Sequence, residues 1–140
     1  MKRLSWDDYG MALAKTAALR GDCRRTRVGA FILAADHHFV GGGYNGVDPG
    51  EVGCLDGACP RGLLSKEELP PLSDYESGPG RCIARHAEDN ALLFTDRSER
   101  IGGTIYVTYQ PCSRCMKSIK GSGLIRAVWP GGEWGRWPSA

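Results

Sequence analysis

Apolar residues recur every three or four positions in three parts of the chain, which predicts amphipathic helices over residues 6–19, 82–94 and 111–120. Ser5 precedes the first of these segments and, with Asp8, resembles a capping box. Pro111 suits the first turn of the last segment, and Gly121 suits its end. The polar positions between the apolar ones indicate that each helix has one face against a core.

Short runs rich in β-branched and aromatic residues predict four strands, over residues 28–34, 39–44, 104–108 and 124–129. Three glycines in the second run suggest that another backbone approaches it closely. Helices and strands alternate in the second half of the chain, so helices should cover a mixed sheet. We therefore expect an α/β protein with a three-layer α/β/α fold and a sheet of four or five strands.

The remaining segments lack a regular pattern. Residues 46–80 are rich in Gly, Pro and Ser and predict a long insertion loop, in which residues 65–69 could form one helical turn. Residues 130–140 form a short tail to which we assign no structure. Nothing in the pattern divides the chain, so residues 1–140 are expected to form a single domain.

Composition excludes several classes of protein. The chain has 140 residues, 24% of them charged, and a net charge of only +2, which disfavours a strongly basic polyanion binder. No apolar run approaches the length of a membrane span, and the start lacks the apolar stretch of a secretory signal. Six cysteines in such a chain are expected to be metal ligands or reduced thiols. We expect a cytoplasmic protein with no membrane partner.

Two short motifs carry metal chemistry. His86-Ala87-Glu88 precedes Pro111-Cys112-Ser113-Arg114-Cys115 in the sequence. One imidazole and two thiolates can hold Zn²⁺ and leave a fourth tetrahedral position open, which is typical of a catalytic rather than a structural zinc. Glu88 lies two residues from His86, so its carboxylate should stand beside that open position and act in proton transfer. The alternative is a closed zinc knuckle in a non-enzymatic zinc-binding module.

The same motifs match H-x-E…P-C-x-x-C, the signature of zinc nucleobase deaminases. Together with further blocks in family order, they make the chain similar to the deoxycytidylate (dCMP) deaminase family, within the cytidine deaminase superfamily. These blocks are Arg27-Val28-Gly29-Ala30, Gly43-Tyr44-Asn45-Gly46, His86 to Ala91, Tyr106-Val107-Thr108 and Pro111 to Cys115. The resemblance implies a five-stranded mixed sheet, one catalytic zinc, and zinc-dependent hydrolysis of dCMP to dUMP and ammonia. It also implies a homo-oligomer, commonly a hexamer.

The resemblance assigns further roles to four residues. Asn45 would contact the sugar, the backbone N–H of Ala87 would contact the cytosine carbonyl, Tyr109 would stack on the base, and Arg25 would bind the 5′-phosphate. A turn asparagine, a strand-end aromatic and a solvated basic run are the simpler interpretations of Asn45, Tyr109 and Arg25.

The end of the predicted helix over residues 82–94 is a second place where the resemblance assigns a role. Phe94 and Arg97 fall where related enzymes make subunit contacts. A frayed helix end is the simpler interpretation of that segment.

Four cysteines remain outside this site: Cys23, Cys54, Cys59 and Cys82. Some dCMP deaminases carry a second, structural zinc with ligands from the corresponding regions, so the resemblance implies such a site here. Four thiols satisfy a closed tetrahedral site, and His37 or His38 could replace one of them. The alternative is that these cysteines are small buried residues or unligated thiols.

Other substrates stay open. Another cytosine compound, such as cytidine, deoxycytidine, a modified dCMP or a cytosine-containing antibiotic, would need the same chemistry. A tRNA adenosine deaminase is disfavoured by the low net charge and by Gln110, where adenine-acting relatives commonly have glutamate. We therefore expect a small pyrimidine nucleotide, and no large nucleic acid, as partner. Pro49 falls one place late for the family's loop associated with allosteric nucleotide binding.

Overall fold

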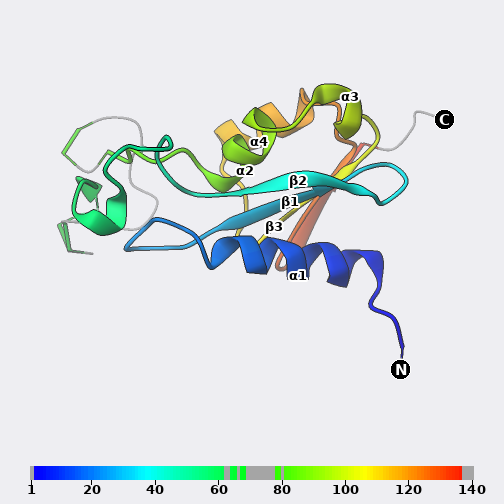
Figure 1. The fold of residues 1–140 in the computed structure, drawn as a ribbon, viewed down its shortest axis with the longest axis horizontal. Coiled ribbons are helices and arrows are strands. Elements are labelled where there is room, and N and C mark those ends of the chain that lie inside the picture. Colours follow the sequence, from blue (N-terminus) through cyan, green and yellow to red (C-terminus); the bar gives the residue numbers. More distant parts are fainter. Residues whose placement is uncertain (1, 62–63, 66, 69–77, 80, 137–140) are drawn as a thin grey trace.

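A five-stranded mixed sheet forms the centre of the computed structural model, which describes residues 2–61, 64–65, 67–68, 78–79 and 81–136 (Figure 1). The strands are ordered β2-β1-β3-β4-β5 across the sheet. β1 runs antiparallel to β2 and β3, β3 and β4 are parallel, and β5 returns antiparallel to β4. The strands are β1 (Gly29–Leu33), β2 (Phe39–Tyr44), β3 (Thr104–Val107), β4 (Arg126–Trp129) and β5 (Gly132–Gly135).

Helices cover both faces of this sheet, so the three-layer α/β/α prediction is confirmed. α1 lies on one face, whereas α2, α3 and α4 lie on the other (Figure 1). The elements are α1 (Trp6–Ala18), the short 3-10 helix η1 (Cys54–Asp56), α2 (Ala87–Leu93), α3 (Arg97–Arg100) and α4 (Ser113–Lys120). Ser5 caps α1 by accepting a hydrogen bond from the Asp8 backbone N–H at 3.0 Å, as the sequence predicted.

Glycine in β2 lets the α2 backbone approach the sheet. A Cβ at position 43 would lie 2.6 Å from the Ala91 nitrogen and 2.8 Å from the Ala87 oxygen, both on α2. Real Cβ atoms are essentially never found so close to backbone. The glycine run therefore sets how near α2 sits to the sheet, as the sequence suggested.

Each face of the sheet has its own apolar cluster. The larger one packs under α2 and α4 and includes fully buried Ile32, Ile105, Val107 and Ile119. The smaller one packs under α1 around Ala14, Leu33 and Tyr106. These clusters fix the helices against the sheet, and α2 and α4 thereby come to lie side by side.

Two expectations about secondary structure were wrong. Residues 82–86 do not belong to the helix predicted over 82–94, because the Arg85 backbone pairs with Gly46 in a β-bridge and α2 begins only at Ala87. The tail is not structureless, because a turn at Gly131, whose φ is +85°, lets Gly132–Gly135 add a fifth strand. The predicted helical turn at 65–69 lies partly outside the described residues. No helix in the described part of the chain is long and apolar enough to cross a membrane.

Candidate active site

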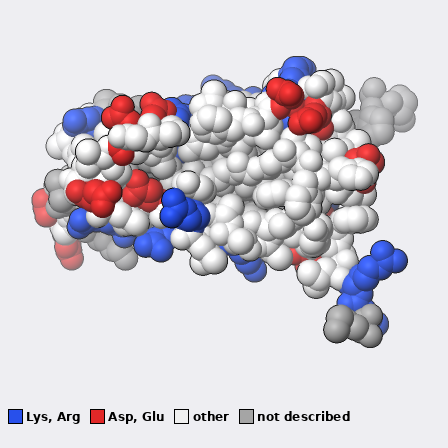
Figure 2. All heavy atoms as spheres, viewed as in Figure 1, with Lys and Arg blue, Asp and Glu red and all other residues white. Residues whose placement is uncertain are grey.

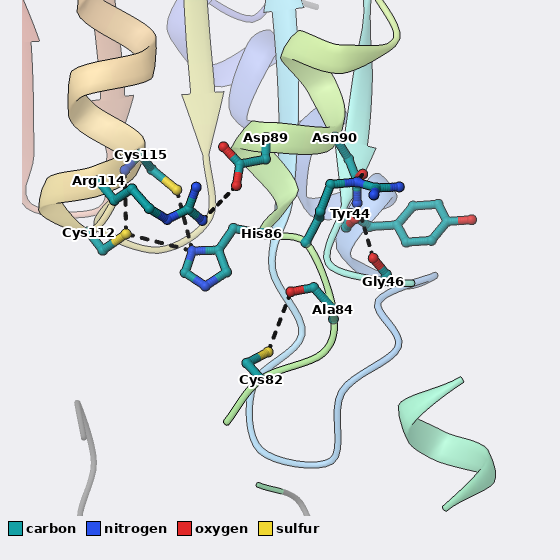
Figure 3. Close-up of polar contacts among 11 residues, drawn as sticks. Tyr44, Gly46, Cys82, Ala84, His86, Asp89, Asn90, Cys112, Arg114 and Cys115 are labelled. Carbon is teal, nitrogen blue, oxygen red and sulfur yellow. Dashed lines mark hydrogen bonds and ion pairs between the residues drawn. The ribbon is translucent and has the colours of Figure 1, made fainter. Parts of the chain in front are cut away.

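The two motifs meet where α2 and α4 begin. His86 is the N-cap residue of α2, and Cys112 is the N-cap residue of α4, with its sulfur accepting a hydrogen bond from the Cys115 backbone N–H at 3.5 Å. Both caps have extended backbone, so each helix starts abruptly after a loop. Figure 3 shows the imidazole of His86 facing the two sulfurs.

The donor atoms lie at distances that suit one metal ion. The Nδ1 atom of His86 is 3.6 Å from the Cys112 sulfur and 3.3 Å from the Cys115 sulfur. Zinc bonds of about 2.3 Å to sulfur and about 2.0 Å to nitrogen place neighbouring tetrahedral ligands about 3.5–3.8 Å apart. The donor atoms of His86, Cys112 and Cys115 all lie within 4.8 Å of one another. No other group of three potential ligands in the described part of the chain is this close together. The residues present therefore fit zinc with one open position.

Glu88 is buried next to this trio. Glu88 is only 4% exposed and lies in the first turn of α2. Burial raises the pKa of the Glu88 carboxyl above its usual range. A carboxyl beside the open metal position is placed to accept a proton and return it.

A family model describing the cytidine and deoxycytidylate deaminase zinc-binding region matches residues 4–130. The chain belongs to this deaminase family. The deoxycytidylate deaminase of Mycobacterium phage D29 is 47% identical over 130 residues, which cover 93% of this chain and 98% of that protein. The deoxycytidylate deaminase of Schizosaccharomyces pombe is 35% identical over 129 residues, but only 37% of that protein is covered. The deaminase therefore spans nearly the whole length of the phage protein and a little over a third of the yeast one.

The fold of the deaminase also matches solved structures. The dCMP deaminase of cyanophage S-TIM5, solved in complex with dCMP and dUMP, superposes with a TM-score of 0.65. The match covers 92% of this chain and 83% of that one, at 21% identity. The apo form of the same cyanophage enzyme gives a TM-score of 0.64. At this identity the match establishes the shared architecture.

An ion pair joins the two helices of the deaminase beside the trio, and the sequence analysis did not find it. Arg114 donates from Nη2 to Oδ2 of Asp89 at 2.6 Å (Figure 3). Arg114 stands between the two cysteines on α4, and Asp89 follows Glu88 on α2. The side chain of Asp89 is 17% exposed and that of Arg114 is 47% exposed. Opposite charges inside the two metal-ligand motifs were the available signal.

Asn45 and Arg25 contact backbone in the structure. Asn45 Oδ1 accepts a hydrogen bond from the Val28 N–H at 2.9 Å, and its Nδ2 donates to the Thr26 oxygen at 2.8 Å. Arg25 Nη2 donates at 3.1 Å to the oxygens of two insertion residues, Leu64 and Ser65. These contacts are compatible with the turn and loop roles that the sequence left open.

The other predicted substrate contacts lie near the start of the two helices. Ala87 is the first residue of α2, so its N–H belongs to the helix's unpaired first turn. Tyr109 is 53% exposed and precedes Cys112 by three residues. A separate hollow of about 510 Å³ contains none of the three metal ligands and is lined by Cys23, Arg24, Arg25, Thr26, Arg27 and Leu55.

The remaining cysteines gather near the insertion. Cys54 and Cys59 are 1% and 3% exposed and pack in one cluster with Ala84, against which Cys82 also lies. Burial raises the pKa of Cys54 to about 12, and the neighbouring thiol of Cys59 adds to this rise. Burial also raises the pKa of Cys82, with added contributions from Cys59 and Cys23. Cys54, Cys59 and Cys82 thus share one cluster, of which Cys23 is not a member. No three of the four sulfurs lie within 4.8 Å of one another.

Proposed function

We propose that this deaminase hydrolyses dCMP to dUMP and ammonia. The observation that carries the proposal is the meeting of His86, Cys112 and Cys115 beside buried Glu88. The near full-length match to a phage deoxycytidylate deaminase supports dCMP as the substrate.

In this proposal His86, Cys112 and Cys115 hold zinc. Zinc bound at such a site supplies Lewis-acid chemistry that makes a water a nucleophile at neutral pH. The Glu88 carboxylate accepts a proton from the attacking water and gives it to the ring nitrogen N3 of cytosine. It then takes the remaining proton of the hydroxyl added at C4 and gives it to the amine, which leaves as ammonia while the C4 carbonyl forms. Burial of Glu88 excludes bulk water from these transfers, since only 4% of the residue is exposed.

Other residues of the site would orient the nucleotide. The Ala87 N–H would donate to the cytosine carbonyl, because the N–H groups of a helix's first turn have no partner within the helix. The exposed ring of Tyr109 can stack on the base. Asn45 retains one further N–H for the sugar after its contact with Thr26. Arg25 would bind the phosphate by exchanging its contacts with Leu64 and Ser65 for charge-assisted ones.

Side-by-side rates test the proposal. We expect dCMP to be deaminated with a higher kcat/KM than deoxycytidine, cytidine, dCTP or adenosine. A preference for deoxycytidine over dCMP would transfer the assignment to the nucleoside alternative, and no turnover of any cytosine compound would favour a non-enzymatic zinc module. On the face drawn in Figure 2, basic and acidic side chains are interspersed rather than gathered in one continuous basic patch.

We also propose that Cys23, Cys54, Cys59 and Cys82 hold a second, structural zinc. The clustering of Cys54, Cys59 and Cys82 supports it. The Cys23 sulfur also supports it, because it accepts backbone N–H groups from Arg25 and Thr26 at 3.4 Å each. Deprotonated thiols would draw together around the ion. Elemental analysis of protein purified without chelators should give two zinc ions per chain, and one after Cys54→Ser/Cys59→Ser. One zinc in the unaltered protein would end this proposal.

Self-association is proposed through the end of α2 and the start of α3. Leu93 and Phe94 at the end of α2 are 59% and 64% exposed, and Ile101 at the end of α3 is 59% exposed. Exposed apolar side chains of this size support an interface with another copy of the chain. Arg97, the first residue of α3, donates to the Gly121 oxygen at 2.7 Å. Light scattering should show a homo-oligomer, and Phe94→Glu should weaken its association.

We also propose a cytoplasmic location for the protein.

A further inference from the structure

The turn after β2 is attached to the residue that precedes the metal ligand on α2. Gly46 is buried, and its N–H donates to the Arg85 oxygen at 3.1 Å. The Arg85 N–H donates back to the Gly46 oxygen at 3.0 Å, which completes a two-bond bridge. Asn45 therefore lies beside one end of this bridge, and His86 lies beside the other.

Side chains reinforce the same bridge. Asn90, which is 8% exposed, donates from Nδ2 to the Tyr44 oxygen at 2.8 Å and approaches the Gly46 oxygen at 3.5 Å. Its Oδ1 accepts a hydrogen bond from Arg85 Nε at 2.9 Å. Arg85 Nη2 in turn pairs with Oδ1 of Asp48. Figure 3 shows Asn90, Tyr44 and Gly46 side by side.

Both the oxygen and the nitrogen of the buried Asn90 amide take part in this network, as do the Nε and Nη2 atoms of Arg85. A buried amide is costly unless its donors and acceptor are satisfied, so Asn90 favours this one position of the turn. Asn90 also donates its backbone N–H to the His86 oxygen at 3.0 Å, so the network includes the helix turn that carries Glu88. None of its members belongs to the apolar clusters that hold the sheet and helices together.

We propose that Arg85 and Asn90 are positioning residues that fix the turn carrying Asn45 relative to Glu88. This inference rests on the proposed function, in which Asn45 contacts the sugar and Glu88 acts on the base. The network would hold the sugar contact and the reacting carboxylate at one separation. A misplacement of about 1 Å can reduce turnover about 100-fold, so even a small relaxation of the turn should be measurable.

The central test is a double-mutant cycle between Arg85→Gln and Asn45→Ala on dCMP. Arg85→Gln should lower kcat/KM about 10- to 100-fold, mainly through KM, and should leave the active-site zinc bound. In the Asn45→Ala background the same change should cost less than about 3-fold, because the positioned contact is already missing. Arg85→Lys should recover only part of the loss, because an ammonium does not reproduce the two-nitrogen fork. The matched control is Arg3→Gln, because Arg3 is exposed and far from Arg85 in the sequence.

Hydrogen exchange provides a readout that does not depend on activity. The Gly46 amide should exchange at least about 10-fold faster in Arg85→Gln than in the unaltered protein, with the melting temperature little changed. Asp48→Ala tests the network from its exposed end if Arg85→Gln fails to fold, and it should raise KM in the same direction.

Two results would overturn the positioning role while leaving dCMP deamination intact. One is an active unaltered enzyme whose Arg85→Gln and Asp48→Ala variants keep its KM. The other is equal loss from Arg85→Gln with and without Asn45. Absence of dCMP turnover in the unaltered enzyme would instead remove the proposed function itself, and with it this inference.

Discussion

Adding a single methyl group to β2 should disturb the zinc site through the backbone. In Gly43→Ala the new Cβ would lie 2.6 Å from the Ala91 nitrogen, whereas ordinary contact begins at 3.4 Å. The α2 backbone or β2 would have to move about 0.8 Å, and overpacking of this kind typically costs about 1–3 kcal/mol. At about 3 °C per kcal/mol for a chain of this size, the melting temperature should fall by about 3–9 °C.

The same displacement should reach the chemistry, because α2 carries Glu88 and begins directly after His86. We expect dCMP turnover to fall by about 10- to 100-fold, and zinc to be lost to a chelator faster than from the unaltered protein. Gly121→Ala is the matched control, because a Cβ there meets nothing closer than 3.6 Å. The assays are thermal unfolding, turnover and zinc release on both variants. A Gly43→Ala protein with unaltered melting temperature and zinc retention would refute the reasoning about this contact.

Three further predictions concern charged side chains. Arg114→Gln should increase zinc loss to a chelator by about 2- to 5-fold, since the ion pair with Asp89 joins the two ligand-bearing helices; unchanged retention would make the pair incidental. Hydrogen bonds from Arg126 lower the pKa of Asp7 below 3.8 in the folded protein. The ionised Asp7 therefore stabilises the fold above about pH 3.8, and this stabilisation disappears as the pH falls through the lowered pKa. In Asp7→Asn the free energy of unfolding should fall less steeply with pH in this acid range, and an unchanged pH dependence would contradict this role of Asp7. Arg25→Ala should reduce kcat/KM about 10- to 150-fold for dCMP but much less for deoxycytidine, whereas equal losses would indicate a role in holding the insertion.

The sequence predicted those features that depend on local pattern. The cap at Ser5, the strand Phe39–Tyr44 and the spacing of Cys112 and Cys115 are each encoded within a few neighbouring residues. The trio with His86 could also be predicted, because its motif is specific to one chemistry.

Features that depend on distant partners were not predictable in the same way. Arg85 looked helical by periodicity, yet its backbone pairs with Gly46, 39 positions earlier, and its side chain reaches Asp48. The strand Gly132–Gly135 forms because it pairs with the edge of β4. Its polar and glycine-rich residues have low strand propensity, so the sequence did not predict it. Tertiary pairing outweighed local propensity in both cases.

The role of Glu88 in proton transfer is tested most directly by assaying Glu88→Gln for zinc and for dCMP turnover on the same sample. Glutamine keeps the shape of the side chain and leaves His86, Cys112 and Cys115 in place, but it cannot accept the proton. We expect unchanged active-site zinc with turnover reduced at least about 100-fold. Turnover near that of the unaltered enzyme, at equal zinc content, would contradict it.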